Sequence, residues 1–192
     1  MGDFGEKMNR FFLCLLVCFF ITGCQTVPLD RATVFYERAT FPEKLQKDTG
    51  ALSEPILQHG RCQLYLGTPD ATRTTNVRFC TYALTEKSLL IQEWNMVNTK
   101  YVQFMDIHFS RLTSVDLASF LRTKQVKMLE PQRLIGIGAV IDEGGYGDGE
   151  ATERIFQVIK AQGIPSKGDD KLLTAPPAPA PVAVPVFIPR IR

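Results

Sequence analysis

The hydrophobic positions of this chain recur in short runs that are typical of β-strands. Between residues 56 and 165, stretches rich in Val, Ile, Leu, Tyr and Phe alternate with polar or glycine-containing links. These runs predict seven strands, at Arg61–Leu66, Val77–Leu84, Ser88–Asn95, Lys100–Ile107, Leu112–Leu117, Gln125–Glu130 and Arg133–Ile141. The short link Thr85–Lys87 predicts that the second and third strands form a hairpin. We therefore expect a mainly β domain of antiparallel strands.

Two of these strands allow a finer expectation about which faces are buried. In Ser88–Asn95 the apolar residues do not keep one phase, which predicts burial on both faces. In Lys100–Ile107 the alternation is regular. It predicts one side made of Tyr101, Gln103, Met105 and Ile107, and an opposite side made of Val102, Phe104 and Asp106.

One amphipathic helix is expected after the last strand, at Glu150–Gln162. Ile155, Phe156 and Ile159 form an apolar stripe at helical spacing. Asp148 or Gly149 is expected to start the helix, and Gly163 followed by a proline is expected to end it.

Seven strands followed by one helix resemble the order of the pleckstrin-homology-like (PH-like) fold. The segment Tyr82–Ile91, which reads YALTEKSLLI, looks like a hairpin of GRAM and bacterial PH-like domains. The resemblance implies an open barrel of bent, nearly orthogonal sheets that is closed by the C-terminal helix. The long stretch Gly136–Gly149 departs from the short final link of that family. A lipocalin-like barrel is the alternative.

The first 24 residues combine a basic flank, a short apolar run and a cysteine. Lys7 and Arg10 precede the uncharged run Phe11–Ile21, which is too short for a membrane span of about 20 residues but has the size of a signal-peptide core. The next residues, Ile21-Thr22-Gly23-Cys24, resemble the lipobox of bacterial lipoproteins. An ordinary signal peptide, or an uncleaved anchor with a chance cysteine, is the alternative.

The lipobox resemblance implies that Cys24 carries the lipid, a diacylglycerol and an N-acyl chain such as palmitate. Two or more acyl chains anchor a protein stably to a membrane. Gln25 follows the cysteine, and the absence of an Asp there favours the periplasmic side of the outer membrane, with the inner membrane as the alternative.

The chain then divides into four parts. Residues 1–23 are the expected signal peptide, and residues 24–55 are an expected tether with a short helix near Leu29–Thr40. Residues 56–165 form the PH-like domain, and residues 166–192 are an expected disordered tail rich in Ala and Pro. The apolar, basic end of this tail, 184–192, is a candidate for docking a partner in extended form.

Two cysteines, Cys62 and Cys80, remain in the expected mature protein. If Arg61–Leu66 and Val77–Leu84 pair around the turn-like stretch 68–72, the two cysteines lie opposite each other. Cβ atoms of directly opposed strand residues are close to disulfide distance. A Cys62–Cys80 disulfide is therefore expected, with two buried free thiols as the alternative.

Two further groups of residues are considered as sites of chemistry. Asp142, Glu143, Asp148 and Glu150 lie on a glycine-rich loop and are candidate Ca²⁺ ligands, with a plain strand-to-helix connector as the alternative. Asp106 and His108 share a strand face, but no serine or cysteine nucleophile motif lies nearby. We expect no cofactor and no catalytic residue.

Two groups of surface residues remain. A basic rim is conceivable from Arg73, Arg78, Lys87 and Lys100, with scattered surface charge as the preferred interpretation. The aromatic residues Trp94, Tyr101, Phe104 and Phe109 are expected in the core, with a protein-binding patch as the alternative.

Composition limits the function classes. The chain of 192 residues is 45% hydrophobic and 22% charged, with a formal net charge of +2, which is too small to indicate a nucleic-acid partner. We expect a lipid-anchored binding or assembly module of the bacterial envelope that acts through a protein partner and is not an enzyme. A lipid- or small-ligand-handling barrel is the alternative, and an envelope hydrolase is less favoured.

Overall fold

The seven predicted strands are all present. The computed structural model describes residues 35–50, 54–70, 74, 76–142 and 146–175. Its strands are β1 (Gln58–Gly67), β2 (Asn76–Leu84), β3 (Ser88–Asn95), β4 (Lys100–His108), β5 (Ser114–Phe120), β6 (Thr123–Leu129) and β7 (Leu134–Val140), and a 3₁₀ turn, η1 (Phe109–Arg111), follows β4. Each strand overlaps its predicted range, so the prediction of a mainly β domain is confirmed.

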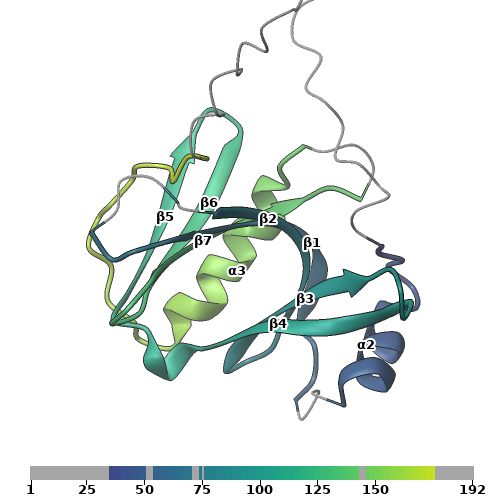
Figure 1. Cartoon of the computed structure of the whole chain (residues 1–192). Helices are drawn as coiled ribbons and strands as arrows, with labels where there is room; N and C mark the ends of the chain where they lie inside the picture. Colours follow the sequence, from purple (N-terminus) through teal and green to yellow (C-terminus); the bar gives the residue numbers. More distant parts are fainter. Residues whose placement is uncertain (1–34, 51–53, 71–73, 75, 143–145, 176–192) are drawn as a thin grey trace, which may run out of the picture.

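The strands form one antiparallel sheet in the order β4-β3-β2-β1-β7-β6-β5. β1 is the central strand, because it pairs with β2 on one side and with β7 on the other. Figure 1 shows β1 curving, so that the sheet bends around α3. The sheet ends at β4 and β5, which do not pair with each other. A closed lipocalin-like barrel is therefore wrong, and the open sheet with its C-terminal helix is consistent with the PH-like fold.

The helix α3 (Gly149–Ala161) fills the inside of the bent sheet. It begins and ends one residue earlier than the predicted range Glu150–Gln162. Asp148 caps it, because its Oδ1 accepts the Ala151 N–H at 2.9 Å. Gly163 adopts a φ of 79° just beyond the end, a backbone conformation that glycine reaches without strain.

The inside of the sheet is a filled apolar core. Residues from all seven strands and from α3 make one buried cluster, represented by Cys62, Cys80, Leu89, Ile107, Val115, Val126, Ile135 and Ile155. Burying one such aliphatic side chain contributes about 1.5–3 kcal/mol. This contiguous packing, with α3 inside it, holds the two halves of the sheet together.

Burial of β3 on both faces is confirmed, but the regular alternation predicted for β4 is wrong. Leu89 and Ile91 lie in the inner core, whereas Leu90 lies in a second cluster on the outer face. The register of β3 and β4 shifts between Ile91 and Gln92. Such a bulge reverses the phase of the side chains beyond it. Tyr101 therefore packs in the outer cluster, although Ile107, which has the same parity, packs in the inner core.

A helix covers the outer face of the β1–β4 half at a place where none was expected. α2 spans Phe41–Thr49, whereas residues 35–40 of the helix predicted near Leu29–Thr40 are not helical, and residues 29–34 lie outside the described residues. Pro42 occupies the first turn of α2, where backbone N–H groups have no partner within the helix, so a proline costs no hydrogen bond there. Part of the expected tether thus packs on the domain, with Phe41 and Leu45 fully buried.

The segment after α3 packs on the outer face of the other half of the sheet. We call residues 166–174 the C-terminal strap. It is hydrogen-bonded by Asp116 on β5, by Lys127 and Gln125 on β6, and by Thr74. Leu173 in the strap is only 5% exposed. The first part of the expected tail is therefore ordered on the domain.

Candidate functional site

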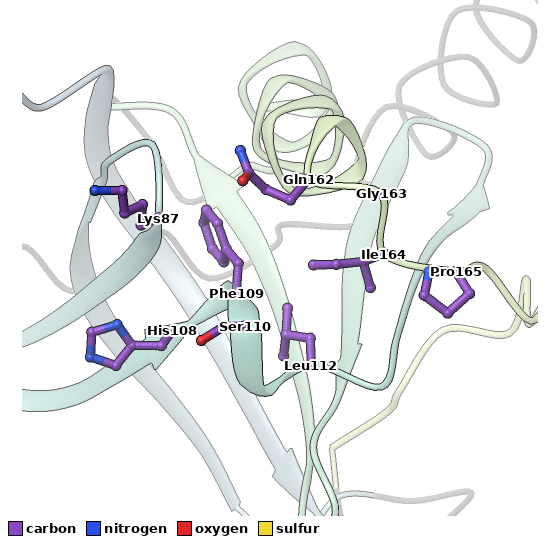
Figure 2. A pocket seen from close by; sticks show the side chains of 9 residues that line it. All are labelled: Lys87, His108, Phe109, Ser110, Leu112, Gln162, Gly163, Ile164 and Pro165. Atoms are coloured by element: carbon purple, nitrogen blue, oxygen red, sulfur yellow. The ribbon is translucent and has the colours of Figure 1, made fainter.

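A cleft of the domain lies where β4 turns into β5, beside the end of α3. Its volume is about 560 Å³. Its lining residues are Lys87, His108, Phe109, Ser110, Leu112, Gln162, Gly163, Ile164 and Pro165. Figure 2 shows Phe109, Leu112 and Ile164 between the β4–β5 connection and the end of α3, with Lys87 and His108 on the β4 side. The cleft therefore has an apolar centre and a polar margin.

Local backbone contacts build this cleft. The Phe109 N–H donates to the Lys87 carbonyl at 2.9 Å, which ties η1 to the β2–β3 link. Gly163 lets the chain reverse after α3, and Lys160 Nζ donates to the Ile164 carbonyl at 3.0 Å. The Val115 N–H then donates to the Pro165 carbonyl at 2.9 Å. The chain after α3 thus occupies part of the β5 edge and forms one wall of the cleft.

The margin of the cleft carries charged groups that are already paired. Lys87 Nζ lies 3.1 Å from Glu54 Oε1, and this contact lowers the pKa of Glu54. His108 Nε2 lies 3.1 Å from Asp106 Oδ2, so the two residues share a face as expected. Within the residues that the structure describes, no hydrogen bond links His108 to a serine or cysteine. The pair therefore offers a polar contact for a ligand.

An unpaired strand edge leads into the cleft. β4 is the last strand of the sheet order, and among the described strands only β3 pairs with it. The first outward N–H of the edge, that of Tyr101, donates to Asp48 Oδ2 of α2 at 2.9 Å. The rest of the edge runs from Val102, which is 42% exposed, to His108 in the cleft. A free edge of this kind is a template for pairing with another extended segment.

The structure does not assemble the conceivable basic rim. Arg78 bonds Glu93 at 2.5 Å and its guanidinium lies 4.6 Å from the centre of the Phe104 ring. Lys87 lies at the other end of β2 and is paired with a carboxylate, and Arg73 lies outside the described residues. Charge is therefore dispersed, as the preferred interpretation expected.

Cys62 and Cys80 are direct cross-strand partners in the β1–β2 pair, so the predicted register of this hairpin is confirmed. Both residues are buried free cysteines in the structure. Burial raises the pKa of the Cys80 thiol to about 12 and raises the pKa of Cys62 as well. The thiols are therefore poor nucleophiles, and their disulfide stays a prediction for the oxidised protein.

The candidate metal ligands have other roles where they are described. Asp142 Oδ2 accepts a hydrogen bond from Arg38 Nε at 2.8 Å, and Asp148 caps α3. Glu150 lies in the first turn of α3, and Glu143 lies outside the described residues. No group of three or more His, Cys, Asp or Glu side chains suited to a metal occurs in the described part of the chain. Metal binding by this loop stays a prediction.

The aromatic residues belong to two separate clusters. Phe109 is buried in the inner core, and Phe104 packs against that core. Tyr101 is buried in the outer cluster, and Trp94 packs against it. Phe35 covers Trp94, since the two rings stack with centroids 4.4 Å apart. The chain's own N-terminal segment therefore occupies the face that was considered as a protein-binding patch.

The sequence did not reveal this outer cluster, which includes a half-buried histidine. His59 Nδ1 is bonded to the Tyr36 hydroxyl at 2.9 Å, and its ring stacks on Phe41 at 5.2 Å. Burial, together with the nearby Arg38 charge, lowers the pKa of His59. The available signal was the pair Phe41 and Leu45, which are four residues apart and therefore lie on one face of a helix.

Several predicted features lie outside the described residues. These are the signal peptide, the lipid-bearing Cys24, Gln25 and the apolar end of the tail at 184–192. Within the described ranges, no helix has the length and apolar character that crossing a bilayer requires.

No protein-family model and no curated protein matches this chain. Solved structures that are similar to it contain PH domains. A Vav1 exchange factor structure with PH and C1 domains matches at 10% identity and a TM-score of 0.42, over 64% of this chain and 32% of that chain. The Slm1 PH domain in complex with inositol-4-phosphate matches at 12% identity and a TM-score of 0.38, over 55% of this chain and 94% of that PH-domain chain.

A third similar structure is the DH/PH fragment of PDZRHOGEF in complex with human RhoA. It has 11% identity and a TM-score of 0.42, and the match covers 62% of this chain and 38% of the other. The chain thus spans about a third of the Vav1 and PDZRHOGEF chains. Likeness at this level transfers no function to this chain.

Proposed function

We propose that this chain is a lipid-anchored binding module of the bacterial envelope. Acyl chains on Cys24 hold it at the periplasmic side of the outer membrane, and its domain binds a segment of a partner protein. The observation that carries the proposal is the 560 Å³ cleft at the end of an unpaired strand edge. The domain acts by binding and not by catalysis.

The partner segment pairs with the free edge of β4 and inserts a side chain into the cleft. Main-chain hydrogen bonds to an edge supply affinity, while a pocket at its end supplies selectivity. Phe109, Leu112 and Ile164 offer an apolar floor, and Lys87 and His108 offer polar contacts at the margin. An extended segment with an apolar side chain and an adjacent acidic group fits this arrangement.

The alternative is binding of a lipid or another small ligand in the same cleft. Its volume lies within the range of about 300–1,000 Å³ that is typical of small-molecule pockets. The filled inner core argues against a ligand inside the barrel. A lipid would therefore lie at the surface cleft, where it competes with the protein segment.

The test is crosslinking in living cells, with captured species identified by mass spectrometry. Wild type is compared with Cys24→Ala, with Ser110→Arg in the cleft, and with Ser119→Arg as the matched control at the far end of β5. Both serines are exposed, so neither substitution disturbs the core. We expect capture of one defined protein partner. The captured amount should fall in Cys24→Ala, should be lost in Ser110→Arg and should be unchanged in Ser119→Arg.

Two outcomes would count against this proposal. A partner captured equally by Ser110→Arg and Ser119→Arg would exclude the cleft as the binding site. Capture of no protein, with lipid co-purifying in an amount that Ser110→Arg reduces, would favour the small-ligand alternative.

A further inference from the structure

The C-terminal strap is bound by side chains that are themselves buried. Asp116 is 6% exposed, and its Oδ1 accepts the N–H groups of Lys167 at 2.9 Å and Gly168 at 2.8 Å, together with the Ser166 hydroxyl. One carboxylate oxygen thus receives three hydrogen bonds from consecutive strap residues. Such charge-assisted bonds are stronger than neutral ones.

Two neighbouring residues of β6 bind the middle and the end of the strap. Lys127 is 4% exposed and pairs with Asp169, which lowers the pKa of that carboxyl group. Gln125 is 3% exposed and holds Leu173 at both main-chain groups. Its Oε1 accepts the Leu173 N–H at 2.8 Å, and its Nε2 donates to the Leu173 carbonyl at 3.3 Å. The amide therefore recognises extended backbone.

A notch in the sheet receives the Leu173 side chain. A Cβ atom on Gly136 would lie 2.9 Å from Leu173 Cδ1 and 3.1 Å from Gln125 Cδ, so the absence of a side chain at Gly136 makes this space. Beyond the notch, the Thr74 N–H and hydroxyl both donate to the Thr174 carbonyl, at 3.3 and 2.7 Å. The site thus combines space for one aliphatic side chain, one buried cation, and side chains that hydrogen-bond the main chain of an extended segment.

The strap fills this groove only in part. A space of about 240 Å³ lies on one side of it, against Lys127, Leu129 and Leu134. A second space of about 260 Å³ lies on the other side, against Tyr65 and Tyr146. Residues 166–171 are exposed, so the strap is held mainly by polar contacts and by the one buried side chain of Leu173. Segments held in this way open more easily than the core.

We propose that this outer face of β5–β7 is a binding groove for an extended peptide of a partner protein. That peptide carries a carboxylate four residues before a leucine or isoleucine, the spacing that Asp169 and Leu173 show in the strap. The strap is the groove's occupant within the same chain, and a partner peptide replaces it. This groove is separate from the cleft beside β4, so the inference goes beyond the proposed function.

The buried cation is the strongest argument for this peptide chemistry. A peptide that takes the place of the strap buries Lys127, Gln125 and Asp116 again, and buried polar groups that it leaves unpaired are costly. A peptide with the same spacing restores each contact and can extend into the adjoining spaces. An uncharged or basic peptide leaves Lys127 unpaired.

The test measures binding of a fluorescent synthetic peptide, IPSKGDDKLLTA (residues 164–175), to the full chain. In the double variant Asp169→Ala/Leu173→Ala the strap is weakened and the groove is intact. We expect this variant to bind the peptide at least tenfold more tightly than wild type. The ratio of the two affinities should match the opening equilibrium of the Leu173 amide measured by hydrogen exchange in wild type, because only the open fraction binds.

A charge exchange tests the specificity. A peptide with Lys at the Asp169 position should lose at least tenfold in affinity for the strap-weakened variant. Adding Lys127→Glu to that variant should restore binding of the altered peptide and abolish binding of the original one. If Lys127 only supported the fold and did not contact the peptide, Lys127→Glu would not restore binding of the altered peptide.

Three results would overturn the proposal. The first is failure of the peptide to bind a strap-weakened variant whose near-ultraviolet circular dichroism matches wild type. The second is equal binding of both peptides. The third is a wild-type dimer in light scattering that the peptide dissociates, since the occupant would then be a second copy of this chain.

Discussion

Replacing Phe41 by Ala tests whether α2 is an integral part of the domain. The Phe41 side chain is 1% exposed, and its ring centre lies 5.0 Å from that of Tyr101 and 5.2 Å from that of His59. Truncating a buried Phe to Ala typically costs 3–5 kcal/mol. Because α2 can also detach from the sheet, we expect the lower end of this range, about 3 kcal/mol of unfolding free energy.

The assay is urea unfolding followed by the fluorescence of Trp94, the only tryptophan of the chain. Trp94 stacks on Phe35, just before α2, and lies 5.1 Å from Tyr101, so its emission reports on this cluster directly. Detachment of α2 should shift the emission to longer wavelength before the main transition. Val97→Ala is the matched control, since this residue is 91% exposed and its truncation should change stability by less than about 0.5 kcal/mol.

The reasoning would be refuted by a Phe41→Ala protein that loses less than about 1 kcal/mol and keeps the wild-type emission. That result would mean that the 35–50 segment contributes little to the domain. The outer face of β1–β4 would then be available to a partner.

Three further predictions concern single sites. The pKa of His59 is lowered from 6.5 in the fold, so its contribution to the free energy of unfolding should be complete above pH 6.5 and should be lost as the pH falls through the lower folded pKa. Urea unfolding between pH 7.5 and 5 should show this loss of stability. The variant His59→Gln should show a weaker dependence on pH. A Cys62–Cys80 disulfide should place the intact mass of the oxidised protein about two daltons below its reduced mass, and a mass that reductant leaves unchanged would refute it. Asp148→Ala should lower the thermal stability by about 1 kcal/mol through loss of the α3 cap, while no loss would contradict the capping role.

The sequence predicted the elements whose signals are local. Alternation and glycine or proline at the ends located the seven strands, and the stripe Ile155, Phe156 and Ile159 located α3. The equal spacing of Cys62 and Cys80 from a turn predicted their register. Each of these signals is contained in one strand, helix or hairpin.

What the sequence did not reveal depends on distant residues. Proline usually interrupts a helix, whereas Pro42 opens α2, and α2 has only two buried residues to mark it. Gln125 and Lys127 alternate with inward-facing Val126 and therefore look solvated, but the strap covers them. The strap itself has a polar, glycine-containing sequence, so nothing local shows that it packs.

The cleft could not be predicted for the same reason. Phe109 and Ile164 meet only because η1 and the reversal at Gly163 bring two distant segments together. Both segments lie outside the predicted strands and helix, and no local pattern indicates that they face each other. The free edge of β4 likewise follows from the sheet order, which no single strand encodes.

The most direct test of the account is position-specific photo-crosslinking in living cells. A photoreactive residue is placed at Ser110 in the cleft or at Val102 on the β4 edge, and Ser119 serves as the distant control. The account predicts that both test positions crosslink to the same protein, through one extended segment of that protein, and that Ser119 does not. Crosslinks to that protein from Ser119, with none from Ser110 or Val102, would contradict it.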